Sequence, residues 1–253
     1  ARPAGGETGT VYDRFRAAKT FKGQDQQAVV DELSNWIMLH HRNILPLIKI
    51  SRLDFQIAAL MEMRKATLAD LLAKHKLEWP TLCSVLLQIC DALAYAFKEH
   101  GLAHLDIKPE NVLIDEFAGN VQVSDWGISR LAVNGRISGS TGGTLVYCGP
   151  ERFQKCLAIG PVSDIFSIGM LGIFALTLDM PYAIRRDEKK FGAPLDQVRS
   201  QICSGEYFAN ATRVLARQPS AIRQLLLQCI NPDPRRRIDN YDYLRSTLEG
   251  LGK

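Results

Sequence analysis

The sequence predicts an α+β fold in two lobes, a small β-rich lobe with one helix and a larger, mainly helical lobe. Short strand patterns occupy about the first sixty residues, and long apolar helical patterns dominate after Lys65. The 253 residues suffice for one large domain or for two packed lobes around a shared cleft. We place the small lobe at about 1–61, a hinge at about 62–65 and the large lobe at about 66–253.

Strand and helix signals alternate in the small lobe. One helix is predicted over 24–39, because its apolar residues recur at i, i+4, i+7 and i+8. These residues are Val29, Leu33, Trp36 and Ile37. Short apolar runs on either side of the helix predict strands at 10–12, 17–21, 44–50 and 55–63. We expect the hinge near the end of the last strand.

The large lobe begins with a helix-start signal. Thr67 and Asp70 stand three residues apart, which is the spacing of a capping box. A long apolar-rich helix is predicted over 81–100, and Gly101 is a natural C-cap for it. Apolar runs at 112–114 and 121–123 bracket a turn signal at 118–120 and predict a β-hairpin.

Helices are expected to complete the large lobe. The run 165–178 is apolar on all sides, which predicts a helix at the centre of the lobe. Two amphipathic helices are predicted to close it, over 221–230 and 241–251. The run 135–143 is rich in glycine, serine and threonine and predicts a mobile loop.

Composition and charge exclude several classes of function. Apolar residues make up 46% and charged residues 23% of the chain, as in ordinary soluble globular proteins. A net charge of +4 is small for this length and predicts no nucleic-acid partner. With no recognisable signal peptide and no apolar run long enough to span a bilayer, we expect an intracellular, cytoplasmic protein. The six cysteines lack zinc or disulfide spacing, which predicts reduced, buried thiols.

The most informative run is His104-Leu105-Asp106-Ile107-Lys108-Pro109-Glu110-Asn111, followed fourteen residues later by Asp125-Trp126-Gly127. The Asp106 carboxylate can accept a hydrogen bond from a hydroxyl and orient it, and Lys108 can balance charge nearby. Asn111 and Asp125 offer the oxygen ligands that magnesium prefers. Alone, the first run could be an ordinary polar turn, but the strand signals that surround it argue against that reading.

Both runs match motifs of the protein kinases, the catalytic loop H-x-D-x-K-x-x-N and the metal-binding D-x-G. The chain resembles a eukaryotic-type protein kinase catalytic domain over nearly all of its length, and Lys108 resembles the Ser/Thr branch. The resemblance implies the bilobal kinase fold, the use of ATP and Mg²⁺, and transfer of the γ-phosphoryl group to serine or threonine of a protein substrate. It implies that Asp106 is the base, Lys108 balances charge, and Asn111 and Asp125 bind metal. It also leaves room for a regulatory protein partner.

The resemblance further implies a set of nucleotide-binding residues. Lys19 follows Ala17-Ala18 as in the V-A-x-K strand of kinases, and its expected ion-pair partner is Glu32 on the next helix. The alternatives are a solvated lysine and a surface acid. The other expected contacts are Gly6, Gly9 and Val11 above the nucleotide, Met61, Glu62 and Met63 along the adenine edge, and Val11, Ala17 and Leu113 on the faces of the base.

Three landmarks further along the chain add to the resemblance. The run 143–151 resembles G-T-x-x-Y-x-A-P-E, which implies that Thr144 lies beside the catalytic base and Lys108. Asp164 resembles the buried aspartate that braces the backbone of the catalytic loop. Arg237, in a run similar to D-P-x-x-R, is the expected buried partner of Glu151.

Several positions depart from the kinase pattern. Leu105 stands where most regulated kinases have an arginine that pairs with a phosphate on the activation loop, which predicts activity without that phosphate. Trp126 replaces the phenylalanine of D-F-G and is expected to stack on His104. Ala4 occupies the first glycine position of the glycine-rich loop, and Gly149 replaces an alanine.

The connection between Val11 and Lys19 is short for a kinase, so either this hairpin is shortened or a segment is absent. Together with Leu105 and Ala4, it motivates a second hypothesis, a pseudokinase that acts as a scaffold or binding module with weak or no phosphoryl transfer. A kinase-fold enzyme that acts on a small molecule is a third. The retained polar catalytic residues favour the protein kinase.

Overall fold

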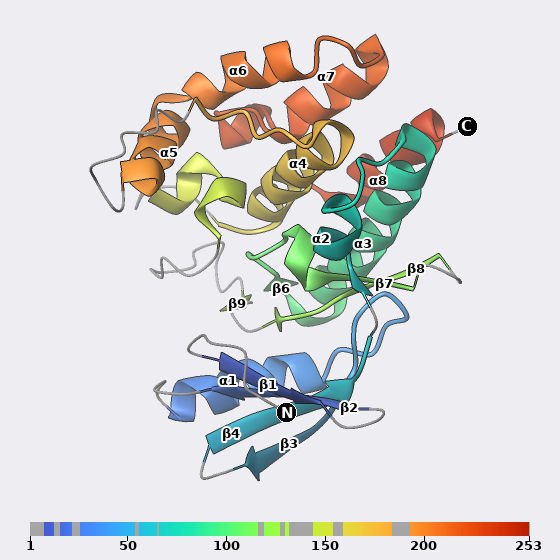
Figure 1. Ribbon diagram of the computed structural model, residues 1–253, viewed down its shortest axis with the longest axis vertical. Coiled ribbons are helices and arrows are strands. Elements are labelled where there is room, and N and C mark those ends of the chain that lie inside the picture. The colour runs from blue at the N-terminus through green and yellow to red at the C-terminus, as the bar shows by residue number, and fades with distance from the viewer. Residues whose placement is uncertain are drawn as a thin grey trace.

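The computed structural model describes residues 8–12, 16–21, 26–53, 56–64, 66–115, 119–126, 130–131, 144–153, 159–183 and 193–252. These residues form a small N-terminal part built on one sheet and a larger, mainly helical C-terminal part (Figure 1). The predicted α+β, bilobal fold is confirmed.

The small part is a four-stranded antiparallel sheet with one helix packed against it. The strand order is β1-β2-β4-β3, for β1 (Thr8–Tyr12), β2 (Arg16–Phe21), β3 (Leu47–Leu53) and β4 (Gln56–Glu62). Helix α1 (Gln26–Ile37) contacts β3 and β4, and Val29, Leu33 and Trp36 on its apolar face are buried. Strands β1 and β2 pair antiparallel, with Tyr12 opposite Ala17.

The third strand begins later than the predicted 44–50. Pro46 has no N–H to donate to a sheet, and β3 begins just after it at Leu47. Ile44 instead forms an isolated parallel bridge with Val123 in the larger part. The Leu45 N–H donates to the Val123 carbonyl at 2.9 Å, and the Val123 N–H donates to Asn43 at 2.8 Å. The segment between α1 and β3 therefore joins the two parts.

The larger part contains two small sheets, a set of helices and several short 3₁₀ turns. The strands are β5 (Ala66–Thr67), β6 (Leu102–Ala103), β7 (Val112–Asp115), β8 (Asn120–Val123) and β9 (Arg130–Leu131). The helices are α2 (Leu68–Leu72), α3 (Trp79–His100), α4 (Pro161–Thr177), α5 (Ala193–Ser204), α6 (Glu206–Val214), α7 (Ser220–Cys229) and α8 (Tyr241–Leu251). The 3₁₀ turns are η1 (Pro109–Asn111), η3 (Leu145–Tyr147), η4 (Pro150–Phe153) and η5 (Pro234–Arg236).

The local signals for helix ends are confirmed. The Asp70 N–H donates to the Thr67 hydroxyl at 3.1 Å while the Thr67 N–H donates to the Asp70 carboxylate at 2.8 Å, which completes the capping box of α2. Gly101 ends α3 in the left-handed conformation at φ 65°, where glycine carries no Cβ penalty. The helix begins at Trp79 rather than 81, because Pro80 is tolerated in the first turn.

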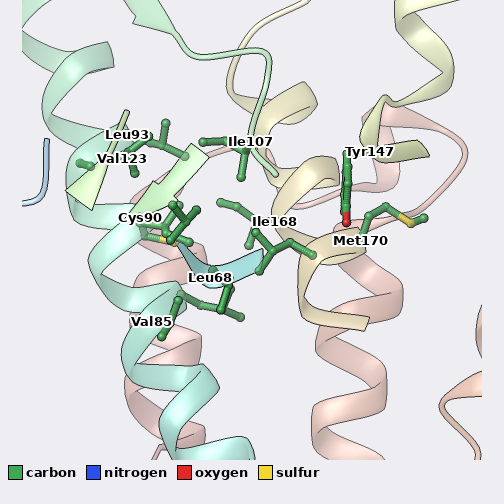
Figure 2. Close-up of a cluster of buried hydrophobic side chains, with 14 of the residues drawn as sticks. Leu68, Val85, Cys90, Leu93, Ile107, Val123, Tyr147, Ile168 and Met170 are labelled. Atoms are coloured by element: carbon green, nitrogen blue, oxygen red, sulfur yellow. The ribbon is translucent and has the colours of Figure 1, made fainter. Parts of the chain in front are cut away.

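Helices α3 and α4 form the centre of the larger part, with α7 packed on α4 and α8 on α3. Figure 2 shows side chains of α2, α3, α4 and the β7–β8 hairpin meeting in one cluster. Ile107 belongs to this cluster and is fully buried. It lies in the segment 104–111, called the catalytic loop below, so the core holds the peptide next to Asp106.

Within the described part of the chain, α3 is the one helix whose length and apolar composition would allow it to cross a membrane. It packs against α4, β6, β8 and α8, as the core helix of a globular domain does. Of the six cysteines, Cys83, Cys90, Cys148 and Cys229 are free and buried, and Cys203 is free and exposed. Cys156 and the predicted mobile loop 135–143 lie outside the described residues.

Candidate active site

One buried aspartate of α4 holds the start of the catalytic loop. The Asp164 carboxylate accepts hydrogen bonds from the backbone N–H groups of His104 at 2.8 Å and Leu105 at 2.7 Å. A third comes from the hydroxyl of Tyr241 in α8 at 2.8 Å. Burial raises the pKa of Asp164 above its ordinary value, although His104 and these three donors act in the opposite direction. The predicted brace is confirmed, and α8 takes part in it.

Two residues of the site have a left-handed backbone conformation, Leu105 at φ 67° and Asp125 at φ 61°. For a residue other than glycine this conformation costs roughly 1–2 kcal/mol. The Leu105 peptide is held by hydrogen bonds on both sides, since its N–H donates to Asp164 and its carbonyl accepts from the guanidinium of Arg152. Strained backbone of this kind is common where the fold has to aim a functional side chain.

The Asp106 carboxylate is held by three groups. Its Oδ1 accepts from the backbone N–H of Thr144 at 3.0 Å, as the resemblance implied. Its Oδ2 accepts from the amide nitrogen of Asn111 at 3.0 Å and lies 2.8 Å from Nζ of Lys108. The Asp106 and Lys108 side chains keep 12% and 19% of their surface exposed. The carboxylate is therefore oriented by its neighbours and still partly exposed.

Asn111 and Asp125 provide oxygen atoms close to this carboxylate. The Asn111 amide nitrogen also donates to the Asp106 carbonyl at 2.8 Å, which leaves the amide oxygen to act as a ligand. The Ser124 N–H donates to the Asn111 carbonyl at 2.9 Å, so Asp125 is held next to the loop. Among the described residues no group of three His, Cys, Asp or Glu side chains could hold a metal ion. An amide and a carboxylate suit Mg²⁺, which usually takes its other ligands from water and substrate phosphates.

Lys19 crosses from the small part to meet Asp125. Its Nζ lies 2.6 Å from Asp125 Oδ1, with 20% and 32% of the two side chains exposed. Burial raises the pKa of Asp125, but the attraction and hydrogen bond of Lys19, together with His104 and Lys108, outweigh burial and hold the pKa below its ordinary value. Asp125 is therefore charged at neutral pH. The side chain of the expected partner Glu32, in α1, lies outside the described side chains, so the Lys19–Glu32 pair stays a prediction.

A cavity of about 370 Å³ opens between the two parts and collects half of the predicted nucleotide-binding residues and both predicted metal ligands. The predicted residues that line it are Lys19, Met61, Glu62, Met63, Asn111, Leu113 and Asp125. Gly9 and Val11 lie in β1 and Ala17 in β2, but their side chains are outside the described ones. Gly6 lies outside the described residues altogether.

Eight further residues line the cavity that the sequence did not assign to it, among them Arg64, Thr67 and Asp70. Arg64 pairs with Glu62 at 2.9 Å and donates to Gln122 of β8 at 2.7 Å, which ties the hinge to the larger part. The capping pattern of Thr67 and Asp70 predicts the start of α2, but it does not predict that this helix begins beside the cavity.

The aromatic residue after Asp125 packs against the catalytic loop. The ring centroids of Trp126 and His104 are 4.7 Å apart in an edge-to-face arrangement, and both side chains are fully buried. The His104 ring nitrogen lies 3.0 Å from the Ser124 carbonyl. The predicted contact is confirmed, and it joins the two functional segments through their side chains as well as their backbones.

The predicted pair of Glu151 and Arg237 is a fully buried, bidentate ion pair. The two guanidinium nitrogens lie 2.8 and 3.1 Å from the carboxylate oxygens, and neither side chain is exposed. Arg237 also donates to the carbonyls of Val162 at 2.7 Å and Asn231 at 2.9 Å. The pair therefore anchors the 3₁₀ turn η4, which follows the segment that contacts Asp106, to the helices of the larger part.

Comparison with known proteins identifies the same kind of domain. A family model described as "Protein kinase domain" matches residues 8–247. Sperm motility kinase Z of Mus musculus is 28% identical over 180 residues, which cover 70% of this chain and 34% of that protein. CBL-interacting protein kinase 21 of Oryza sativa subsp. japonica is 35% identical over 156 residues, covering 60% and 29%. SNF1-like protein kinase ssp2 of Schizosaccharomyces pombe is 25% identical over 245 residues, covering 94% and 42%. The chain thus spans less than half the length of each of these relatives.

Proposed function

The chain belongs to the protein kinase family, and on that premise we propose that it is an ATP- and magnesium-dependent serine/threonine protein kinase. The observation that carries the proposal is the convergence of four polar side chains from separate segments. Lys19 of β2, Asn111 of the catalytic loop and Asp125 after β8 line one cleft, and the Asp106 carboxylate accepts a hydrogen bond from Asn111. The proposal takes 1–61 as the small lobe, 62–65 as the hinge and 66–253 as the large lobe.

Each side chain has a separate task in this proposal. Asp106 accepts a hydrogen bond from the substrate hydroxyl, orients it in line with the phosphoryl group and takes its proton. Lys108, 2.8 Å from Asp106, balances negative charge that develops beside it. Magnesium-bound ATP supplies the phosphoryl group. Asn111 and Asp125 hold the metal, and Lys19 holds the α and β phosphates.

The hinge and the sheet would bind the base and sugar. Met61, Glu62, Met63 and Leu113 all line the cavity. Hinge backbone groups would bind the adenine edge, and apolar side chains would pack on its faces. Gly6, Gly9, Val11 and Ala17 complete this site in the proposal, with Glu32 as a second partner of Lys19.

We expect Mg²⁺ with ATP to raise the melting temperature of the chain by about 5–10 °C at a nucleotide concentration near one hundred times Kd. Binding to the native state must stabilise it, and differential scanning fluorimetry measures the shift. Asp125→Ala is expected to abolish the magnesium-dependent part of the shift and the transfer of labelled phosphate to a generic basic protein. A shift of equal size in Asp125→Ala would contradict the assignment of that residue.

The same assays separate this proposal from a pseudokinase scaffold. The short hairpin of β1 and β2 and Leu105 motivate that alternative, which predicts partner binding without phosphoryl transfer. A kinase-fold enzyme for small molecules predicts transfer that needs no protein acceptor. The name of the rice relative, CBL-interacting protein kinase 21, supports a proposal that this chain also has a regulatory protein partner. We further propose an intracellular location.

Because Leu105 replaces the arginine that binds an activation-loop phosphate, activity is expected not to depend on phosphorylation of the loop that contains Ser138, Ser140 and Thr141. The three residues would be replaced together by alanine, and kcat compared with that of the unmodified chain. We expect the two values to agree within about twofold, because leucine and not arginine directly precedes Asp106. Loss of transfer in the triple variant would contradict this expectation.

A further inference from the structure

The backbone N–H and carbonyl of Leu105 are both held by side chains from outside the catalytic loop. Its N–H donates to Asp164 Oδ1 at 2.7 Å, and its carbonyl accepts from Nη1 of Arg152. Leu105 is buried and has φ 67°. A leucine keeps this conformation only where the surrounding structure holds it. Both contacts therefore stabilise the conformation of the backbone directly before Asp106.

The 3₁₀ turn η4 places Arg152 next to the Leu105 carbonyl. Arg152 follows Glu151, whose carboxylate is fully buried and paired with Arg237. The Arg152 N–H donates to the Gly149 carbonyl at 3.1 Å and closes the turn η4. A Cβ at Gly149 would lie 2.5 Å from Glu151 Oε1, so the alanine of the kinase pattern does not fit this turn without displacing the carboxylate. Glycine therefore permits the tight turn that presents Arg152.

Two departures from the kinase pattern are thus connected with the hydrogen bond between Arg152 and the Leu105 carbonyl. With Leu105 in place of arginine, the catalytic loop lacks a guanidinium at this position. Gly149 belongs to the turn that brings the guanidinium of Arg152 to the Leu105 carbonyl. The segment 144–153 contacts the loop at a second point, where the Thr144 N–H donates to Asp106 at 3.0 Å. Neither contact uses a phosphate.

We propose that Arg152 is a positioning residue for phosphoryl transfer, which holds the Leu105 carbonyl and through it sets the orientation of Asp106 without a phosphate on the activation loop. The proposal rests on the proposed function, because it assumes that Asp106 is the base. In this proposal Arg152 acts through the Leu105 backbone and not on the reacting atoms. Its loss should therefore affect the turnover step far more than nucleotide binding.

The test compares Arg152→Met, which keeps the length of the side chain but donates no hydrogen bond, with Arg152→Lys, which can still donate to a carbonyl. In Arg152→Met we expect kcat to fall by roughly 10- to 100-fold, because a small displacement of a catalytic group has effects of that order. The KM for ATP is expected to stay within about twofold, and Arg152→Lys is expected to recover much of kcat. If Arg152→Met failed to fold, Arg152→Leu, which also donates no hydrogen bond, would take its place.

Hydrogen exchange gives a readout that does not depend on activity. In Arg152→Met the backbone amides of residues 102–111 are expected to exchange faster, while those of α3 and α4 keep their protection. Arg236→Met serves as the matched control, because Arg236 lies in the same part of the molecule and is 79% exposed. It is expected to change neither kcat nor exchange in the loop.

The outcomes distinguish failure of the two proposals. Unchanged kcat and unchanged exchange in Arg152→Met would overturn the role of Arg152, as would equal losses in Arg152→Met and Arg152→Lys. If the unmodified chain transferred no phosphate, the proposed function would fail. Faster exchange in Arg152→Met would then still support an ordering role for Arg152, and unchanged exchange would overturn that role too.

Discussion

Replacement of Asp106 by asparagine is expected to lower kcat for phosphoryl transfer by roughly 10²- to 10⁴-fold, the range that general-base catalysis contributes. The amide can still accept the Thr144 N–H, which now lies 3.0 Å from Oδ1, but it can neither take a proton nor carry the charge that faces Lys108. The KM for ATP is expected to change little, since Lys19 and Asp125 are untouched. Steady-state kinetics with labelled ATP and a serine-containing peptide measures both quantities.

Asp179→Asn is the matched control for this variant, because Asp179 is exposed beyond the end of α4 and does not line the cleft. We expect it to leave kcat unchanged. The melting temperatures of the two variants should be compared as well, since the Asn111 amide nitrogen and Lys108 both lose the acceptor Oδ2 in Asp106→Asn. Full activity of Asp106→Asn in a folded sample would exclude Asp106 as the base.

The largest loss of stability is expected from Arg237→Met. Removal of one partner from a buried ion pair leaves the other charge uncompensated, which typically costs about 3–5 kcal/mol of unfolding free energy. Glu151 would then be fully buried without its guanidinium, and the carbonyls of Val162 and Asn231 would each lose a donor. For a chain of this size, the melting temperature should fall on the order of 10 °C. Urea and thermal unfolding measure the change.

The control is a second arginine, Arg245, whose pairs with Asp91 and Glu249 are partly exposed. Arg245→Met should cost about 1 kcal/mol or less, as exposed pairs usually do. Gly149→Ala should act in the same direction as Arg237→Met, because its Cβ displaces the Glu151 carboxylate. The double variant Glu151→Leu with Arg237→Met should regain part of the loss, since no unpaired charge remains. Equal stability of Arg237→Met and Arg245→Met would contradict the argument.

Much of the fold was predictable, because its main elements have strong local signals. The apolar helix α4 and the amphipathic helices α7 and α8 were predicted to within a few residues. Helices α5 and α6 were missed. Among the described side chains of α5, Val198 and Ile202 are the buried apolar ones, and Gly205 interrupts the pattern directly before α6. The two-residue strands β5, β6 and β9 are too short to show any periodicity.

The site was predictable where spacing along the chain defines it, and less so where distant segments meet. Offsets within one loop placed Asp106, Lys108 and Asn111 together. The contact between Lys19 and Asp125 depends on how the small part lies over the larger one, which no local pattern encodes. Arg152 was overlooked for a related reason. Its role follows from a neighbour 47 positions away in the chain, and the missing arginine at Leu105 was the one available signal.

The bond between Tyr241 and Asp164 has a practical consequence for anyone who shortens or tags this protein. The hydroxyl at the first residue of α8 reaches the carboxylate that carries the start of the catalytic loop. A cut ahead of residue 241 would remove that donor from a fully buried acid, so such a fragment would lose more than a peripheral helix. Fluorophores or fusion partners are therefore better attached after α8 than spliced in front of it.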